Sequence, residues 1–362
     1  MSPFLSNGVT IVGAGITGLA LAHILAQANI SVTVIEQQPR QWSPIRVSAL
    51  NRSSCDFLKN IGAWQSIQAD RLTGFSTIEA WVHDSQSAIH FDAANQGQRY
   101  LGYIVLQDEL VRVLWGMATV NKNITLHCPL TLTALSDIKD TSFIVGADGA
   151  TSWVRQHVGI DCEQRTYGQK AIVATVMTEK PHGAVARQRF LKTGPLGVLP
   201  LSDPYHVSIV WSSDDDDADT LMSFDELAFN RALSNALELQ LGYMKLITKR
   251  YVFPLVMRHA KQYVTSNVIL VGDAAHTLHP LAGQGVNLGL KDVMNLSQRL
   301  IALHEKGQWR DDTRELRAYE RERRTDNSIM QAIMWAFHFI RQPVGFKAFD
   351  KCDTLKQWVI PL

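Results

Sequence analysis

The chain has 362 residues, which favours two domains over one, and 46% of them are hydrophobic, which excludes a largely disordered protein. The chain has 35 basic and 34 acidic residues, which gives a formal charge of +1. Its net charge therefore provides no overall electrostatic attraction for nucleic acid. Its four cysteines form no CxxC pair, which argues against a disulfide framework or a zinc site and fits reduced thiols in a cytosolic protein.

The first residues and the apolar segments indicate the cellular compartment. The N-terminus MSPFLSNG has no basic region followed by an apolar one, as a signal peptide would. No uninterrupted apolar run reaches the roughly 18–20 residues that a membrane-spanning helix needs. We therefore expect a cytoplasmic protein that is soluble or peripheral to a membrane.

Residues 9–36 predict a strand, a tight turn, a helix and a second strand. Gly13, Gly15 and Gly18 form a GxGxxG motif within this unit. The first glycine permits the turn, the second lets the backbone approach a pyrophosphate, and the third lets the helix pack on the strand. Glu36 ends the second strand, where it can accept hydrogen bonds from ribose hydroxyls. A lone GxGxxG can arise by chance, but this context predicts a dinucleotide site.

Two later segments repeat the pattern of an apolar strand that ends in glycine and an acid. Asp148 follows a strand in residues 142–155, and Asp273 follows another in residues 267–276. Ligands of an open α/β sheet bind outside the carboxyl ends of its parallel strands. An isolated Asp-Gly is often only a turn. Together with Glu36, however, the two acids predict convergence on a ligand rich in hydroxyl groups.

Residues 161–258 have a different sequence pattern, in which strand-like runs alternate with loops rich in Gly, Pro and Asp. This pattern predicts a mostly antiparallel sheet inserted between the second and third nucleotide-side strands. We interpret the acidic run 214–217 as a solvated loop, since a calcium site needs spaced ligands and a glycine. Ser223 and Glu226 have the spacing of a capping box ahead of a helix that extends to Leu237.

The C-terminal part predicts helices. Residues 308–327 are charged and helical in pattern, and residues 328–341 form a strongly apolar helix candidate. Two interpretations of the apolar segment remain open, core packing and an interfacial helix that touches a membrane or a partner. They concern Met330, Ile333, Met334, Trp335 and Phe337.

The connection after Asp273 contains His276, His279 and Pro280 close together. Two hypotheses compete to explain its function. His276 and His279 could be metal ligands, but zinc needs three or four ligands and only Asp273 is nearby. Pro280 prevents an ordinary helix interior at this point. We therefore expect no metal here.

The alternative is a backbone cradle for a planar cofactor. Asp273 would bind a polyol arm, and the helix that begins near Val286 and Asn287 would turn its free N–H groups and positive dipole end toward an electron-rich ring. This hypothesis accounts for more of the residues in the segment than the metal hypothesis does.

Taken together, these motifs resemble the flavoprotein aromatic hydroxylases of the para-hydroxybenzoate hydroxylase fold, and among them the ubiquinone-biosynthesis hydroxylases of polyprenylated phenols and benzoquinols. The resemblance rests on the GxGxxG unit with its terminal acid, on RVSALNRSS at 46–54, on GADG at 146–149, and on GDAAHTLHPLAGQGVNLGLKD at 272–292. It spans roughly residues 8–330.

The resemblance implies an α/β protein with a Rossmann-like FAD-binding domain, an inserted, mostly antiparallel substrate domain and C-terminal helices. The implied FAD-binding domain is discontinuous and comprises residues 1–75, 105–160 and 265–330. The implied substrate domain comprises residues 76–104 and 161–264, and residues 331–362 form a C-terminal helical tail.

The resemblance also implies roles for individual residues. FAD would be bound by Gly13, Gly15, Gly18, Glu36, Arg46, Gln107, Asp148, Gly149, Asp273, Gly285, Val286 and Asn287. The substrate would lie near Phe253, Pro254 and Pro280. His276 and His279 are candidates for proton handling, although a structural role fits them equally well. No Ser-His-Asp constellation or paired carboxylates are required.

The implied activity is a monooxygenase reaction. NAD(P)H would reduce FAD, O2 would give a flavin C4a-hydroperoxide, and the ring of a polyprenylated phenol or quinol would be hydroxylated. Such a substrate implies contact with the inner face of a membrane or with other ubiquinone-biosynthesis proteins. Two alternatives stay open, namely an FAD-dependent oxidase or dehydrogenase of a small apolar substrate and a non-catalytic flavoprotein of a biosynthetic assembly.

Overall fold

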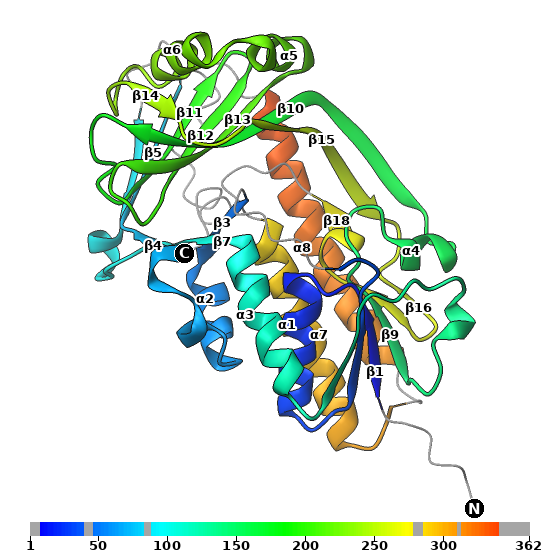
Figure 1. The fold of residues 1–362 in the computed structure, drawn as a ribbon. Helices are drawn as coiled ribbons and strands as arrows, with labels where there is room; N and C mark the ends of the chain where they lie inside the picture. Colours follow the sequence, from blue (N-terminus) through cyan, green and yellow to red (C-terminus); the bar gives the residue numbers. More distant parts are fainter. Residues whose placement is uncertain (1–7, 40–45, 83–87, 278–284, 310–312, 340–362) are drawn as a thin grey trace, which may run out of the picture.

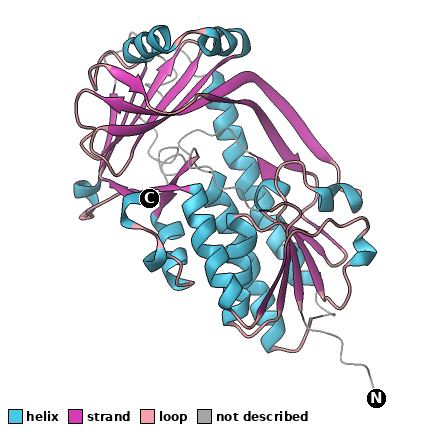
Figure 2. Ribbon diagram, in the orientation of Figure 1, coloured by secondary structure: helices cyan, strands magenta, loops and turns pink. Residues whose placement is uncertain are grey.

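The computed structural model describes residues 8–39, 46–82, 88–277, 285–309 and 313–339, and it contains three β-sheets with flanking helices (Figures 1 and 2). The long strands β10 and β15 run from the upper sheet in Figure 1 down to the lower one and so join the two halves of the molecule. This mixed α/β architecture confirms the predicted fold class.

The first sheet has six strands in the order β16-β17-β9-β1-β2-β8. All neighbours in it are parallel except β16 and β17. Strands β1 and β9 are buried along their whole length, as expected for parallel strands that are covered on both faces. The strands are β1 (Val9–Val12), β2 (Val32–Ile35), β8 (Ile124–His127), β9 (Phe143–Gly146), β16 (Val264–Thr265) and β17 (Val268–Leu270).

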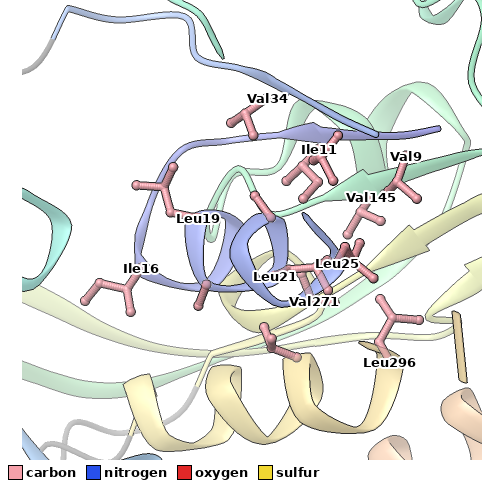
Figure 3. Close-up of a cluster of buried hydrophobic side chains, with 14 of the residues drawn as sticks. Val9, Ile11, Ile16, Leu19, Leu21, Leu25, Val34, Val145, Val271 and Leu296 are labelled. Atoms are coloured by element: carbon pink, nitrogen blue, oxygen red, sulfur yellow. The ribbon is translucent and has the colours of Figure 1, made fainter. Parts of the chain in front are cut away.

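Helix α1 (Ile16–Gln27) lies against this sheet and packs on α3 (Gln107–Val120) and α7 (Gly285–Glu305). Figure 3 shows the apolar core that results, in which side chains of α1 meet those of the sheet and of α7. Asn29 follows α1 with φ of +60°, the left-handed conformation that Asn tolerates at the end of a helix. Core members labelled in Figure 3 include Val9, Ile11, Leu21, Leu25, Val145 and Leu296.

The second sheet has nine strands and is antiparallel except for the pair β11 and β5. Most of it lies between β9 and β17 in the chain, which confirms the predicted insertion. Its strands, in order, are β18 (His276–Thr277), β15 (Tyr251–Ala260), β10 (Cys162–Thr178), β13 (His206–Asp214), β12 (Gly194–Pro200), β11 (Val185–Leu191), β5 (Thr77–Val82) and β6 (Ala88–Asp92), while β14 (Met244–Leu246) pairs with β10.

Two helices cover the outer face of the nine-stranded sheet, α5 (Asp215–Ser223) and α6 (Glu226–Ala236) (Figure 1). Alternate residues of β10 such as Ile172 and Ala174 belong to the apolar cluster that these helices complete with Leu221 and Phe229. The intervening residues of each strand therefore point to the other face, which we call the inner face.

A three-stranded sheet in the order β3-β7-β4 packs against one end of the inner face. There Ala186 and Leu199 of the large sheet meet Ile104 of β7. The elements of this layer are β3 (Val47–Asn51), α2 (Arg52–Asn60), β4 (Leu72–Phe75) and β7 (Gly102–Leu106). Short helical segments elsewhere are α4 (Trp153–His157), η1 (Trp64–Ser66), η2 (Ala69–Arg71), η3 (Ala93–Gln96), η4 (Leu135–Asp137) and η5 (Gly272–Ala274).

Two local predictions in the inserted segment were wrong. The acidic run is not a loop, because Asp215 begins α5 and three aspartates occupy its first turn, where the helix dipole stabilises negative charge. The cap of α6 is Asp225, whose carboxylate accepts the N–H of Ala228 at 2.7 Å. Ser223 instead ends α5 and donates its hydroxyl to the carbonyl oxygen of Thr220.

Helix α8 (Thr313–Phe339) is continuous where the sequence suggested a charged helix followed by a separate apolar one. Met330 and Met334 are buried and Ile333 is half-buried in a cluster with Val82 and Leu288, which confirms core packing for these three. The side chains of Trp335 and Phe337 lie outside the described residues. Of the helices that the structure describes, none combines the length and the apolar character that crossing a membrane requires.

Candidate functional site

The glycine turn after β1 has two tightly packed positions and one open position. Gly13 has φ of +104°, and a Cβ there would collide with the carbonyl oxygen of Ala147. A Cβ at Gly18 would collide with the carbonyl oxygen of Gly13. At Gly15 a Cβ would meet no atom within 4 Å, although this residue caps α1. The helix N-terminus is thus open to a phosphate group, while its neighbours hold the turn against the 146–149 loop.

Glu36 lies beside this turn at the end of β2. Its carboxylate accepts the N–H of Ala14 at 3.0 Å and the N–H of Gln38 at 3.1 Å. An ionised carboxylate can accept about four hydrogen bonds, more than these two backbone contacts use. The acid therefore stabilises the turn and remains suitable for a ribose.

Asp148 follows β9 and carries an unsatisfied acceptor. One carboxylate oxygen accepts the N–H of Val154 at 3.0 Å, whereas the other, Oδ1, is buried without a hydrogen-bond partner among the described residues. Leaving such a group unpaired costs about 1–3 kcal/mol, so it marks a position where a ligand donor would be stabilising. This observation fits a polyhydroxylated cofactor.

The third turn, η5, follows β17 and packs directly on the start of α1. Thr17 lies so close to Gly272 and Gly289 that a Cβ at either glycine would contact its side chain within about 3 Å. The side chain of Asp273 is partly exposed to solvent. The protein atoms around its carboxyl group raise its pKa, and the charges of His276 and Arg46 oppose this increase.

Arg155 joins the second and third turns, a role that the sequence did not reveal. Its guanidinium donates to the carbonyl oxygen of Ala274 at 2.7 Å and to that of Ala150 at 3.0 Å, and the side chain is buried. Arg155 and Ala274 lie 119 residues apart in the chain, so no local pattern marks this contact.

Arg46 and Gln107 are far apart in the chain but adjacent in the structure, because β3 pairs with β7. The backbone N–H of Gln107 donates to the carbonyl oxygen of Arg46 at 2.9 Å, and its side-chain amide donates to Ser48 at 2.8 Å. The guanidinium of Arg46 lies 4.4 Å from the centre of the Phe253 ring. These contacts bring the three-stranded sheet and the nine-stranded sheet together at the site.

The start of α7 is fixed by the side chain of Asn287. Its Oδ1 accepts the N–H of Asn51 at 3.1 Å and the hydroxyl of Ser54 at 2.8 Å, while its Nδ2 donates to the carbonyl oxygen of Ala49 at 2.7 Å. The first N–H groups of a helix have no partner within it. Those of Gly285 and the next residues therefore need partners from outside α7.

The two residues proposed on β15 point in opposite directions. Phe253 pairs with Ala171 and lies on the inner face, beside Arg46. Pro254 pairs with Lys170, whose ammonium group bonds to Asp219 of α5, so Pro254 lies on the outer face. Phe253 and Pro254 therefore cannot both line a site on the inner face, because successive residues of a strand face opposite sides. The predicted Pro280 and His279 lie outside the described residues.

The inner face around Phe253 is largely apolar. Strand alternation and the packing clusters place there Ala80, Val82, Ala171, Val173, Phe190, Val210 and Leu255. Met330 and Met334 of α8 pack on part of this surface. The same alternation places the polar Gln188, Ser208 and Ser212 on this face. The wall therefore suits an apolar ring or chain and also carries a few hydrogen-bonding groups.

Comparisons with known proteins agree with this geometry. The model of the family described as "FAD binding domain" matches residues 7–128 and 136–334. A 3-demethoxyubiquinol 3-hydroxylase from Escherichia coli is 35% identical, and the alignment covers 96% of each chain. The chain belongs to the FAD-binding ubiquinone-biosynthesis hydroxylases.

A second relative and a solved structure are also similar over most of their length. The human ubiquinone biosynthesis monooxygenase COQ6 is 31% identical, with 90% of this chain and 83% of the human protein covered. The crystal structure of p-nitrophenol 4-monooxygenase PnpA from Pseudomonas putida superposes with a TM-score of 0.77 at 19% identity and covers 98% of this chain and 96% of that one. The hydroxylase is thus an FAD-dependent aromatic monooxygenase with the para-hydroxybenzoate hydroxylase fold.

His276 of the hydroxylase does not occupy the position expected of a proton-handling residue. Its ring is buried, 2% exposed, and its Nε2 lies 2.6 Å from Oδ2 of Asp292. An ionised carboxylate only accepts, so the imidazole donates through Nε2 and is committed inside the protein. This geometry favours the structural role that the sequence left open for His276. The described residues contain no group of three or more His, Cys, Asp or Glu side chains suited to a metal ion.

His259, which neighbours His276 across the β15–β18 pair, makes the stability of the hydroxylase depend on pH. Burial, followed by the charges of His276 and Arg324, lowers the pKa of His259 from 6.5 to about 4. Because the folded state disfavours the proton, the free energy of unfolding should fall as the pH drops from 6.5 toward 4. After allowing for solvent screening of this partly accessible ring, we expect a loss of about 1–2 kcal/mol.

The contribution of His259 can be measured by urea unfolding at several pH values between 4 and 7. The His259→Gln variant should lose that part of the pH dependence, whereas a His127→Gln variant should keep it, because His127 is exposed on β8. An unchanged pH slope in His259→Gln would contradict the assignment.

Proposed function

We propose that the hydroxylase adds one hydroxyl group to the aromatic ring of a polyprenylated phenol or quinol in ubiquinone biosynthesis, with NAD(P)H as the reductant. In the balanced reaction, NAD(P)H, one proton, O2 and the ring give NAD(P)+, water and the hydroxylated ring. One oxygen atom of O2 enters the product and the other leaves as water. The name of the Escherichia coli relative, a demethoxyubiquinol hydroxylase, supports this substrate class.

The observation that carries the proposal is the position of the apolar inner face beside the three acid-bearing turns. The Arg46 guanidinium, next to Gln107, reaches the Phe253 ring of that face at 4.4 Å. A cofactor along the turns would therefore lie against a wall that accepts an apolar ring and its prenyl chain.

We assign the residues predicted for FAD to three parts of the cofactor. Gly13, Gly15 and Gly18 would hold the pyrophosphate, with Glu36 on the adenosine ribose and Arg46 and Gln107 nearby. Asp148 and Gly149 would supply a polar loop for FAD and for the visiting NAD(P)H, and Asp273 would bind the ribityl chain. The N–H groups of Gly285, Val286 and Asn287 would donate to the flavin ring, where the helix dipole stabilises negative charge.

When bound, FAD supplies the chemistry that accepts a hydride and activates O2. The protein contributes orientation and exclusion of water. The Arg155 bonds fix the second and third turns relative to one another, and the Asn287 contacts fix the start of α7 on β3 and α2. The buried Met330 and the half-buried Phe190 close one side of the inner face with apolar atoms. Exclusion of water prevents loss of the activated oxygen as peroxide.

The test is a single-enzyme assay with purified hydroxylase, FAD, NADH or NADPH, and a prenylated phenol. We expect substrate to accelerate NAD(P)H oxidation and the product to gain one oxygen atom, which is labelled when 18O2 is used. Formation of hydrogen peroxide with an unlabelled, oxidised substrate would indicate an oxidase. Bound FAD without turnover on any of a series of prenylated phenols and quinols would favour the non-catalytic alternative.

We also propose that the hydroxylase meets its substrate at a membrane surface or within an assembly of ubiquinone-biosynthesis proteins. The polyprenyl tail of the substrate partitions into lipid, and the nine-stranded sheet exposes large apolar side chains near its β14 edge, including Ile247 and Tyr251. Co-sedimentation with vesicles of phosphatidylethanolamine and phosphatidylglycerol should increase when a prenylated phenol is included. No sedimentation in either condition would contradict direct membrane contact.

A further inference from the structure

The motif 272–292 ends in an aspartate, Asp292, to which neither the sequence nor the proposed reaction assigns a role. Asp292 lies in α7 and is completely buried, with 0% of its surface exposed. A buried carboxylate is costly unless it is fully paired, so its retention requires a physical reason.

Asp292 accepts three hydrogen bonds, and two of them flank the cofactor residue Asp273. Its Oδ2 accepts the backbone N–H of Gly272 at 2.9 Å and Nε2 of His276 at 2.6 Å. These donors lie one residue before and three residues after Asp273. The turn is therefore clamped on both sides of the carboxylate that we assign to the ribityl chain.

The third bond connects Asp292 to the C-terminal helix. Oδ1 accepts Nε of Arg323 at 2.7 Å, and the same guanidinium bonds Oδ1 of Asn327 at 3.1 Å. Asn327 in turn donates to the hydroxyl of Tyr263 at 3.2 Å. Burial alone would raise the pKa of Asp292, but the charges of His276 and Arg323 outweigh it and hold the pKa below its usual range.

We propose that Asp292 is a positioning residue for FAD, which it serves by fixing the orientation of Asp273, and that Arg323 of α8 holds Asp292 in place for this task. The inference rests on the proposed function only in assigning Asp273 to the cofactor. It explains why a helix that begins 40 residues after Asp273 is tied to the cofactor turn by a buried ion pair. The hydroxylase would thus need α8 for its cofactor affinity as well as for its apolar core.

The test is a double-mutant cycle on the dissociation constant of FAD, measured by quenching of flavin fluorescence without substrate, NAD(P)H or O2. We expect Asp292→Asn to weaken FAD binding about 30-fold, the range found when a residue that orients a ligand-binding group is lost. In an Asp273→Asn background the same change should cost less than about 3-fold, because its effect passes through Asp273.

A purely structural role predicts a different result. In that case the two losses would be independent and their factors would multiply, which would overturn the inference. Arg189→Lys is the matched control, since Arg189 is equally buried but bonds to the end of α6 and to Glu238 on the outer face. It should lower the free energy of unfolding and leave FAD affinity within about 2-fold.

Asp292→Asn could fail to fold, and two milder variants keep the inference testable. His276→Gln and Arg323→Lys each retain a donor for Asp292 and should weaken FAD binding about 5-fold, with the loss again absent in the Asp273→Asn background. Unchanged FAD affinity in both would overturn the inference. Because the readout is binding alone, a wild-type protein that binds FAD without hydroxylating would refute only the proposed function.

Discussion

The Gly15→Val substitution is expected to weaken FAD binding about 100-fold while the protein remains folded. A Cβ at Gly15 would meet no protein atom within 4 Å, and the backbone there has φ of −76°, which any residue can adopt. The added methyl groups would occupy the space through which the pyrophosphate approaches the start of α1. A 100-fold loss corresponds to about 2.7 kcal/mol of binding free energy.

The matched control for Gly15→Val is Gly116→Val in α3. A Cβ at Gly116 also meets no atom within 4 Å, but this glycine lies in the middle of a helix and away from the three turns. We expect FAD affinity and the melting temperature of this variant to stay near the wild-type values. Isothermal titration of both variants with FAD measures the difference, and equal affinities would refute the role of the glycine turn.

The Arg155→Met substitution should reduce both stability and cofactor affinity. The change removes donors from the carbonyl oxygens of Ala274 and Ala150, of which the first contact is fully buried. Leaving a buried acceptor unpaired costs about 1–3 kcal/mol, so we expect the free energy of unfolding to fall by about 3 kcal/mol. FAD binding should weaken about 10-fold, because the second and third turns would lose their connection.

Chemical unfolding and FAD titration of the Arg155 variants separate these two effects. Arg155→Lys keeps the charge and one donor and should recover about half of each loss. The exposed Arg231 of α6 provides a control, since Arg231→Met should change the free energy of unfolding by less than about 0.5 kcal/mol. If Arg155→Met bound FAD with wild-type affinity, the two turns would not depend on this arginine.

The sequence predicted the parts of the site that depend on local chemistry. Gly13 and Gly18 mark a turn because a Cβ at either position would collide with backbone atoms, and Gly15 leaves the start of α1 open. Glu36 and Asp273 mark strand ends by their position after apolar runs. The parallel sheet and the inserted antiparallel sheet followed from the same periodic patterns. These features are visible because each depends on a few neighbouring residues.

The features that the sequence did not reveal depend on contacts between distant segments. Neither the ion pair of Asp292 with Arg323 nor the bridge from Arg155 to Ala274 leaves a local pattern. The face on which Pro254 lies depends on the register between β15 and β10, and a shift of one residue would reverse it. The sequence left two roles open for His276 for the same reason, since its partner lies 16 residues away on α7.

The central claim is that three turns, far apart along the chain, meet around one FAD molecule. The most direct measurement is the visible absorption spectrum of the purified hydroxylase during titration with FAD, with free cofactor removed. We predict a flavin spectrum perturbed from that of free FAD and a stoichiometry of one FAD per chain. A folded protein that stays colourless and retains no added FAD would contradict the account.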